Sequence, residues 1–395
     1  MTMQLDRMLR EAQALVPELT PVAIESVRAF RWCAVAPPVE VEIRSTFDGI
    51  DQVHVRIGDY AVGTVRLAAT YPSAPPPTGQ ALADAEPLPI DAADVYRDRW
   101  MFHGPAYHGL ARLDEVSASG ITGLLKTREA TGALLDNAGQ LMGFWIMWRK
   151  ERDRLAFPTR IDRLAFYGPH PAPGEHLECR VDIREAGDIE VTADIELVHN
   201  GTVWCTIEGW VGRRFDTDDV IWPTLVYPEK NGVSERQQGG YELCPDRWNT
   251  AAARELIARR YLSATEREAW DARGPRSRRG WLMGRLAAKD AVRRWLWDHG
   301  DGDRFPVEIA ARNDPEGKPL VDGPFDTDLR VSIAHKNEVG VAIVAEGETP
   351  GIDIETIEPR PEEFSSLAFS ASEQALAHGD APVEWQTRLS AAQDA

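Results

Sequence analysis

Cysteine is scarce in this sequence of 395 residues, and its 4 cysteines stand far apart. None of them belongs to a CxxC pair, so the sequence indicates neither a disulfide framework nor a structural zinc site. Residues 1–20 also lack the unbroken apolar stretch of a signal peptide, because charged residues interrupt a helical pattern. Both absences predict a protein of the reducing cytoplasm.

The sequence also has fewer basic than acidic residues, and it lacks long apolar runs. The chain carries 44 Lys and Arg against 63 Asp and Glu, a formal charge of −19, which disfavours nucleic acid as a partner. No segment reaches the ~20 apolar residues that a membrane-spanning helix needs, so the sequence predicts no membrane partner. The length instead favours two or three globular domains.

The first part of the chain contains a helix followed by alternating strands. Residues 4–15 have helical periodicity. Apolar and polar side chains then alternate with the period of half-buried antiparallel strands, at residues 39–45, 53–58 and 61–68. Residues 71–89 hold several prolines and little core material, as linkers do. We therefore predict a partial first domain at 1–78 and a linker at 79–97.

Residues 98–215 repeat this plan with longer elements. A helix is predicted over residues 133–150. Alternating or continuously apolar strands follow it, at residues 160–167, 177–183, 189–198 and 202–213. One helix wrapped by one antiparallel sheet, occurring twice, is the plan of a double hotdog, here with an incomplete first hotdog.

A different module follows a weakly patterned stretch at 216–245, which we predict to be a second linker. Helical patterns open the module, at 250–260, 264–270 and 281–298. Strand patterns follow, at 331–335, 339–345 and 351–355. Ser370 and Glu373 then form a capping pair for a helix at 369–376. The chain is therefore predicted to be α+β, with 246–395 as a separate α+β domain that is truncated at its C-terminus.

Two carboxylates side by side are the first candidate for a functional site. Asp353 and Glu355 alternate with Ile352 and Ile354, so in a strand both carboxylates would point to one face. Their oxygens suit Mg²⁺, which takes one or two protein carboxylates and completes its shell with water and phosphate oxygens. An exposed DxE pair is also common on protein surfaces without such a role.

Motifs in a fixed order surround this pair. They are GRLAAKDAV at 284–292, GKP at 317–319, SIAH at 332–335, GIDIE at 351–355 and FSASE at 369–373. In this order, the region of about 245–395 resembles the 4′-phosphopantetheinyl transferase superfamily.

The resemblance implies that coenzyme A is a substrate and that the serine of an apo acyl carrier protein is the acceptor. Lys318 and His335 would bind the phosphates of coenzyme A. Mg²⁺ on Asp353 and Glu355 would neutralise the pyrophosphate as the serine attacks it. Both basic residues also have a structural explanation, Lys318 in a solvated turn and His335 at a strand end.

The C-terminal helix departs from that family. Family members carry a WxxKEAxxK helix, and RLSAAQDA at 388–395 stands at its place, with Gln393 for the first lysine and Asp394 for the acid. The resemblance therefore implies Asp394 as a third acidic residue at the catalytic centre, whereas Gln393 carries no charge. We expect this chain to transfer phosphopantetheine slowly or not at all.

A second resemblance covers the N-terminal two thirds of the chain. It is carried by FHGPAYHGL at 102–110, LLDNAGQ at 134–140 and FPTRIDRLAFYG at 157–168. These segments resemble the dehydratase domains of polyketide synthases, which are double hotdogs. In that family a histidine of the first hotdog removes the α-proton of a β-hydroxyacyl thioester, and an aspartate on the second hotdog helix helps the hydroxyl leave.

Asp136 matches this catalytic aspartate. Gln140 lies four residues later on the same helical face, where it could orient the carboxylate. Helix capping by Asp136, with Gln140 as an incidental neighbour, is the alternative explanation. None of the 9 histidines stands in the HxxxGxxxxP pattern that carries the family's base, and His103 replaces the tyrosine of a YGP motif. We therefore expect the chain to be the downstream remainder of a dehydratase and not to dehydrate thioesters by itself.

The sequence thus predicts the C-terminal portion of a polyketide or polyunsaturated fatty acid type synthase. An acyl carrier protein and other synthase domains would be its partners. Two alternatives stay open: a non-catalytic scaffold or docking module, and a hotdog thioesterase that works with one carboxylate and a water.

Overall fold

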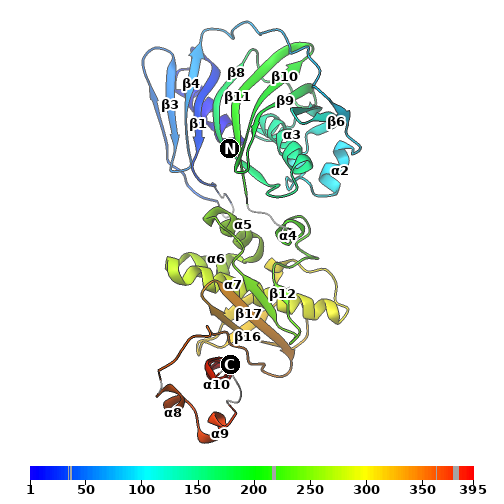
Figure 1. Cartoon of the computed structure of the whole chain (residues 1–395). Helices are drawn as coiled ribbons and strands as arrows, with labels where there is room; N and C mark the ends of the chain where they lie inside the picture. The colour runs from blue at the N-terminus through cyan, green and yellow to red at the C-terminus, as the bar shows by residue number, and fades with distance from the viewer. Residues whose placement is uncertain (34, 36–37, 216–218, 362, 377–381) are drawn as a thin grey trace. The chain divides into compact units, whose positions relative to one another are not determined.

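The computed structural model of the chain describes residues 1–33, 35, 38–215, 219–361, 363–376 and 382–395. It divides into two compact units, Met1–Thr217 and Asp218–Ala395 (Figure 1). Both units combine helices with antiparallel strands, which confirms the predicted α+β class. No helix in the described ranges is long and apolar enough to cross a membrane.

An antiparallel sheet is the frame of the first unit. Among the described residues it has 11 strands in the order β2-β3-β4-β1-β8-β11-β10-β9-β7-β6-β5. In chain order these are β1 (Thr20–Ala29), β2 (Ile43–Phe47), β3 (Gln52–Ile57), β4 (Ala61–Ala68), β5 (Glu86–Pro87), β6 (Leu110–Ser117), β7 (Gly120–Lys126), β8 (Ala156–Phe166), β9 (His176–Ala186), β10 (Glu190–His199) and β11 (Thr202–Arg214). Pairing of β1 with β8 joins the two halves into one sheet.

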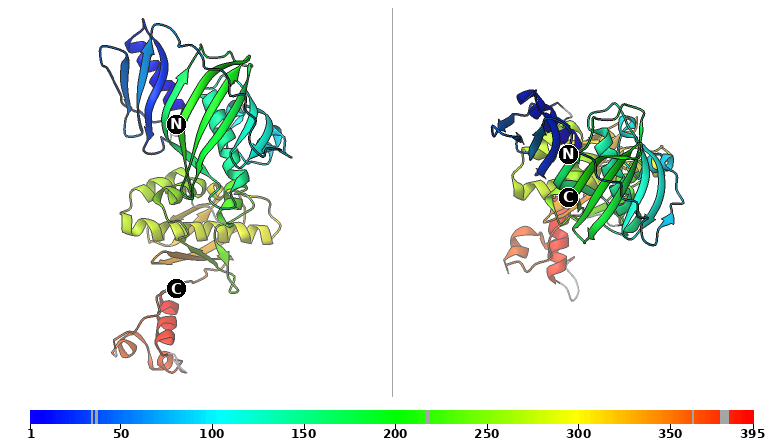
Figure 2. Two further views of the ribbon diagram at one scale, coloured as in Figure 1. Left: turned by 45° about the horizontal axis from the view of Figure 1, so that its top comes forward. Right: turned by 90° about the horizontal axis from the view of Figure 1, so that it is seen from above.

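Each half of the sheet wraps one helix (Figure 2). In the first half, α1 (Thr2–Leu15) packs on β1 to β4 and buries Leu5, Met8 and Ala12. Gly63 on β4 permits this contact, because a Cβ there would lie 2.9 Å from Met8 Sδ. Buried and accessible residues alternate along β3 and β4, as the sequence pattern predicted.

The helix of the second half, α3 (Ala133–Arg149), packs on β6 to β10. Apolar side chains surround most of it, and Leu141 and Phe144 are fully buried. Gly139 faces the Trp210 ring on β11, where a Cβ would lie only 2.8 Å from the ring. Two helices, each wrapped by antiparallel strands, confirm the predicted hotdog plan in this unit.

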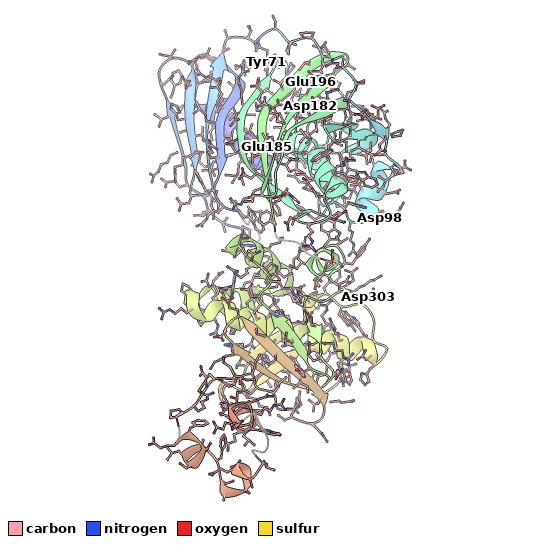
Figure 3. All side chains as sticks on the ribbon, in the orientation of Figure 1. Tyr71, Asp98, Asp182, Glu185, Glu196 and Asp303 are labelled. Carbon is pink, nitrogen blue, oxygen red and sulfur yellow. The ribbon has the colours of Figure 1, made fainter. Side chains whose placement is uncertain are left out.

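The segment that joins the two halves is tied to the sheet. The expected linker at 79–97 contains β5 and the short helix α2 (Ala92–Arg97). Just before it, the backbone N–H and the hydroxyl of Thr78 donate to Glu196 on β10, at 2.9 and 3.2 Å. Glu196 is labelled on its strand in Figure 3. Arg180 on β9 donates to a backbone carbonyl of the same segment. Side chains of the sheet therefore hold the start of this segment at Thr78 and Gln80.

A smaller sheet and one long helix organise the second unit. In the described residues the sheet has the order β12-β13-β17-β16. Its strands are β12 (Glu235–Arg236), β13 (Glu242–Pro245), β16 (Leu329–Lys336) and β17 (Val339–Glu346). The helix α7 (Pro275–Asp298) packs across β13, β16 and β17. Gly340 permits this approach, because a Cβ there would lie 2.3 Å from the backbone carbonyl carbon of Met283.

Shorter elements complete the second unit. They are α4 (Ile221–Val226), α5 (Ala251–Tyr261), α6 (Ala264–Asp271), the hairpin of β14 (Ala310–Asn313) and β15 (Pro319–Asp322), α8 (Phe364–Ala368), α9 (Ala371–Gln374) and α10 (Pro382–Asp394). The predicted capping pair is confirmed at α9, where Ser370 and Glu373 form a reciprocal capping box.

Two segments of this unit differ from the sequence expectation. The stretch 216–245, expected as a linker, contains α4, β12 and β13, and β13 pairs with β17 within the sheet. The strand expected at 351–355 is corrected, because the structure has neither helix nor strand there. Instead, the Ile352 N–H donates to the Ser332 side chain at 3.2 Å. The segment is thus held by a side chain and does not join the backbone ladder of β16.

Buried charges anchor α7. Lys289 is fully buried, and its Nζ donates to Glu266 Oε2 at 2.5 Å and to the Tyr261 carbonyl at 2.7 Å. The neighbouring Asp290 is also fully buried and accepts from two backbone N–H groups, those of Val233 and Ser234, at 2.9 Å each. The lysine and the aspartate of the GRLAAKDAV motif therefore stabilise the fold.

Candidate functional site

The predicted catalytic aspartate lies in the first turn of α3. The turn begins at Gly132, whose φ of +70° is in the left-handed region that favours glycine. The Asp136 N–H donates to the Gly132 carbonyl at 3.0 Å, so the helical ladder starts here. A carboxylate in the first turn is stabilised by the positive end of the helix dipole.

Three side chains surround the Asp136 carboxylate. The Thr2 hydroxyl donates to Oδ1 at 2.9 Å, and Gln140 Nε2 donates to Oδ2 at 2.9 Å. His103 Nε2 lies 3.3 Å from the same Oδ2. The side chains of His103 and Asp136 are 20% and 21% exposed, so this pair is shielded but still reaches solvent.

Gln140 is held in a fixed orientation. Its Oε1 accepts from the Tyr96 hydroxyl at 2.8 Å, and its Nε2 also donates to the Tyr107 carbonyl at 3.0 Å. The Tyr96 hydroxyl accepts in turn from the Leu110 N–H at 3.0 Å. Burial raises the pKa of Tyr96 to about 12, so its hydroxyl stays protonated and can donate. The structure thus brings Gln140 and Asp136 together in the arrangement that an orienting role requires.

His103 reaches Asp136 from the loop that precedes β6. Its ring stacks on Phe102 with centroids 4.4 Å apart, and its backbone carbonyl lies 2.7 Å from His108 Nε2. Its Nδ1 is buried and has no hydrogen-bond partner among the described residues. Burial lowers the pKa of His103, although the Asp136 carboxylate opposes that shift.

An apolar cavity of about 240 Å³ lies beside the start of α3. Its lining comes from α1, from the start of α3 and from the ends of the central strands. Leu9, Leu135, Phe166 and Trp204 give it apolar surface, and the polar side chains of Asp6, Arg10, Gln13 and His170 also line it. Gly132 also lines it, so the cavity adjoins the turn that carries Asp136. A cavity of this composition suits an acyl chain.

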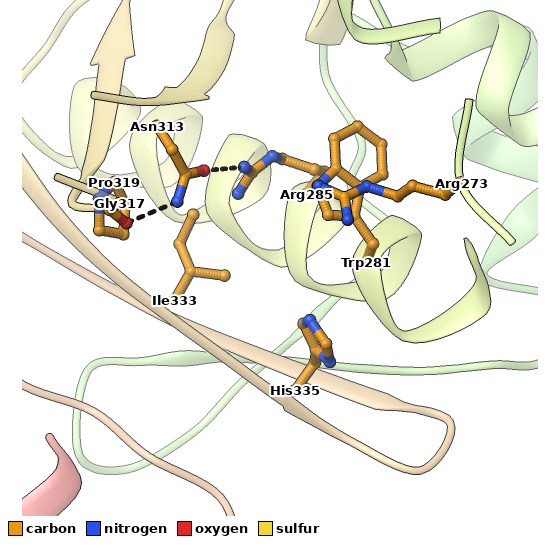
Figure 4. A pocket seen from close by; sticks show the side chains of 8 residues that line it. All are labelled: Arg273, Trp281, Arg285, Asn313, Gly317, Pro319, Ile333 and His335. Carbon is orange, nitrogen blue, oxygen red and sulfur yellow. Dashed lines mark hydrogen bonds between the residues drawn. The ribbon is translucent and has the colours of Figure 1, made fainter. Parts of the chain in front are cut away.

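A second cavity, of about 310 Å³, lies in the second unit (Figure 4). It is lined by Arg273, Trp281, Arg285, Asn313, Gly317, Pro319, Ile333 and His335. The guanidinium groups of Arg273 and Arg285 lie 4.9 and 5.0 Å from the Trp281 ring. Arg285 also donates to the Asn313 side chain.

The charge balance of this cavity favours anions. Burial lowers the pKa of Arg285 to about 10, which still leaves it protonated at neutral pH. The pKa of His335 is also lowered, first by burial and then by the positive charges of Arg285 and Arg273. An anionic ligand would relieve this mutual repulsion.

The other predicted site residues of this unit lie around that cavity or apart from it. Lys318 is exposed between two lining residues, and its Nζ lies 3.4 Å from Thr349 Oγ1. Glu355 Oε1 accepts from Lys336 Nζ at 2.6 Å, and its Oε2 lies 3.5 Å from Arg360. Hydrogen bonding to Lys336 lowers the pKa of Glu355.

Asp353, Glu355 and Asp394 do not converge as the resemblance implied. The end of α10 approaches the acidic segment, because a Cβ at Gly351 would lie 2.9 Å from the Ala395 carbonyl oxygen. However, the described residues contain no group of three or more His, Cys, Asp or Glu side chains that could hold a metal ion. With both oxygens facing cations, Glu355 does not fit a magnesium site in this arrangement.

Several residues of these sites escaped the sequence analysis. Tyr96 and Thr2 contact the Gln140 and Asp136 side chains from distant segments, and no local pattern marks them. Arg285 belongs to the GRLAAKDAV motif, and Trp281 lies four residues before it. Their spacing places both on one helical face, so the sequence could have predicted that they line the same site.

Comparison with known proteins supports one of the two resemblances. Residues 74–220 match the family model described as polyketide synthase dehydratase N-terminal domain. The matched range contains His103, Asp136 and Gln140. It supports a polyketide synthase dehydratase component in this chain. No curated protein matches the sequence.

Solved structures similar to the chain include several dehydratase domains. The dehydratase domain from the CurJ module of curacin polyketide synthase is 18% identical, with a TM-score of 0.42, and the match covers 54% of this chain and 82% of that one. The dehydratase domain of PpsC from Mycobacterium tuberculosis, in complex with C12:1-CoA, is 19% identical, with a TM-score of 0.43, and the match covers 53% and 82%. The dehydratase domain of RzxB from Pseudomonas fluorescens is 12% identical, with a TM-score of 0.42, and the match covers 52% and 83%.

Proposed function

We propose that the first unit is a dehydratase that removes water from a β-hydroxyacyl thioester, with Asp136 as the acid for the leaving hydroxyl. The observation that carries this proposal is the Asp136 carboxylate, held by Gln140 at 2.9 Å in the first turn of a hotdog helix. The family match over 74–220 and the apolar cavity beside Gly132 support it.

The chemistry requires an acid that is oriented and partly shielded from water. Gln140 donates to one oxygen of Asp136 and Thr2 donates to the other, so the carboxyl group cannot rotate freely. A fixed acid near the substrate's hydroxyl can protonate it as the bond from carbon to oxygen breaks. Gln140 and Thr2 therefore orient the Asp136 carboxyl group. The cavity beside Gly132 offers apolar surface to the acyl chain of the substrate.

The test is incubation of the chain with a β-hydroxyacyl thioester of N-acetylcysteamine, followed by chromatography. In contrast to the expectation from the sequence that the chain alone is inactive, under this proposal we expect the enoyl thioester to form. Asp136→Asn should slow its formation by roughly 10² to 10⁴, the usual contribution of a general acid. Asp162→Asn is a matched control, because Asp162 lies on β8 with a half-exposed side chain that faces Arg160. Full turnover by Asp136→Asn would refute the proposed role.

The same chromatogram separates the alternatives. A hotdog thioesterase would release the free acid and the thiol, whereas a dehydratase keeps the thioester bond. A scaffold module would leave the substrate unchanged.

For the second unit we propose 4′-phosphopantetheinyl transfer from coenzyme A to an apo acyl carrier protein. The specific observation that favours it is the cavity in which Arg273, Arg285 and His335 converge. Guanidinium groups bind phosphate oxygens strongly and directionally. The predicted phosphate-binding residue His335 lines this cavity, and Lys318 stands at its edge.

Mg²⁺ stays a separate prediction for this unit, because Glu355 pairs with Lys336 in the structure. If Asp353 nevertheless contributes to a magnesium site, Asp353→Ala should abolish magnesium-dependent binding of coenzyme A while the fold stays intact. Calorimetric titration of parent and variant decides this, and equal affinities would refute the metal assignment.

Coenzyme A binding tests the cavity independently of the metal. We expect Arg285→Met to weaken binding at least tenfold in calorimetry without added metal. Arg259→Met is the control, since Arg259 pairs with Glu255 on α5 and does not line the cavity. Equal weakening by both variants would refute a specific site.

Transfer itself is read as a mass increase of an intact apo carrier protein. Gln393, which stands in place of a lysine, donates to Glu373 at 3.0 Å. We therefore expect slow transfer by the parent chain and faster transfer by Gln393→Lys. Binding of coenzyme A with no transfer by either chain would refute the transferase proposal.

A further inference from the structure

A closed ring of contacts holds His103 against Asp136. Gln140 contacts Asp136, the Tyr96 hydroxyl donates to Gln140, and the Tyr96 ring stacks on the His108 ring with centroids 3.9 Å apart. His108 Nε2 then contacts the backbone carbonyl of His103, whose own Nε2 faces Asp136. Residues from α2, from the loop before β6 and from α3 therefore fix the geometry of one histidine and one carboxylate.

We propose that His103 is the general base of the dehydration, so that base and acid both come from the second hotdog. This inference rests on the proposed function. It replaces the expectation that the chain needs a histidine from an HxxxGxxxxP segment, because His103 lies 3.3 Å from the Asp136 carboxylate.

The atoms balance in a single elimination. His103 Nε2 takes the α-proton of the thioester, and the electrons of that bond form the new double bond between the α- and β-carbons. The bond from the β-carbon to oxygen breaks, and the oxygen leaves as water with a proton from Asp136. The imidazolium then returns its proton to the Asp136 carboxylate, and both groups regain their starting states without a further reactant.

The surroundings of His103 suit this role. Nδ1 has no hydrogen-bond partner among the described residues, so no hydrogen bond there fixes which ring nitrogen carries the proton. Burial and the neighbouring His108 both favour the neutral ring, while Asp136 opposes them. The side chain is still 20% exposed, so a thioester can approach Nε2. Phe102, which stacks on the ring and is 52% exposed, offers an apolar surface at the same place.

The experiment uses the full chain and three variants with a β-hydroxyacyl thioester of N-acetylcysteamine. His103→Asn keeps a polar side chain but cannot take a proton, and His103→Ala leaves a space that free imidazole can enter. His54→Asn is the control, because His54 lies on β3, is exposed and contacts Thr64.

We expect His103→Asn to lose roughly 10² to 10⁴ in rate, as loss of a general base does, and His54→Asn to match the parent. Added imidazole should restore part of the rate of His103→Ala in proportion to its neutral form, whereas a purely structural loss would not respond. Circular dichroism of each variant verifies the fold.

The outcomes separate the two proposals. A parent chain that dehydrates the thioester, together with a His103→Asn variant within threefold of it, would overturn the role of His103 and leave the dehydratase proposal standing. A variant His103→Ala that is folded, slow and unresponsive to imidazole would also overturn it. A parent chain that forms no enoyl thioester would overturn the dehydratase proposal and this inference with it.

Discussion

Glu242 gives the second unit a stability that depends on pH. This carboxyl group lies on β13 with 2% of the residue exposed, and Arg294 on α7 is 3.6 Å away. Its Oε2 has no hydrogen-bond partner among the described residues. Burial is the main reason why the pKa of Glu242 is raised to about 7; Arg294 opposes the shift and the nearby Asp290 adds to it.

The sign and size of the effect follow from this pKa. Between its ordinary value of 4.5 and about 7, folded Glu242 keeps a proton that the unfolded chain loses. Its contribution to stability is therefore complete below pH 4.5 and is lost as the pH rises through about 7. At 1.36 kcal/mol per pKa unit, the free energy of unfolding should fall by up to about 3 kcal/mol over that range.

Glu242→Gln tests this reasoning, because glutamine has the same shape and no titration. We expect the variant to match the parent near pH 5 and to be more stable by about 1–3 kcal/mol at pH 8. Unfolding in urea can be monitored by amide hydrogen exchange in β13 and β17, which measures the stability of this unit specifically. Glu348→Gln, at an exposed position, is the control. Parent and Glu242→Gln curves that stay parallel from pH 5 to pH 8 would refute the reasoning.

Three further changes have defined outcomes. Gly139→Ala places a Cβ 2.8 Å from the Trp210 ring, and thermal denaturation should show a loss of roughly 1–3 kcal/mol from overpacking; an unchanged melting temperature would contradict the close packing. Lys289→Met leaves the Glu266 carboxylate buried without its cation, so chemical denaturation should show a loss of about 3–5 kcal/mol, and a loss below 1 kcal/mol would argue against the buried pair. Because the pKa of His103 is lowered, His103 stays neutral at neutral pH, and the loss of kcat/KM that its protonation causes should appear only below its ordinary value of 6.5; a loss on acidification from pH 8 to 7 would contradict the assignment.

Alternation in the sequence located strands only where the ladder is regular. The range predicted for β4, 61–68, agrees with the structure, because buried and accessible residues alternate without interruption. β1 was not predicted, since its pairing with β4 shifts register twice and Ser26 has a positive φ. Irregularities of this kind break the period of two on which the sequence argument depends.

Residues on one element could be grouped from the sequence, and residues from distant elements could not. The spacing of Asp136 and Gln140 placed both on one helical face, and they do form a hydrogen bond. The contact between His103 and Asp136 depends on the path of the loop before β6, which no local periodicity encodes. In the same way, Arg285 and His335 share a cavity because α7 packs on β16.

The most direct test of the central claim is the mass of a carrier-bound substrate. A β-hydroxyacyl group is loaded on an acyl carrier protein, incubated with the full chain, and examined by mass spectrometry of the intact carrier. The account predicts that the carrier loses the mass of one water with the parent chain and that Asp136→Asn largely prevents this loss. An unchanged carrier mass with the parent chain, or an equally fast loss of water with Asp136→Asn, would contradict it.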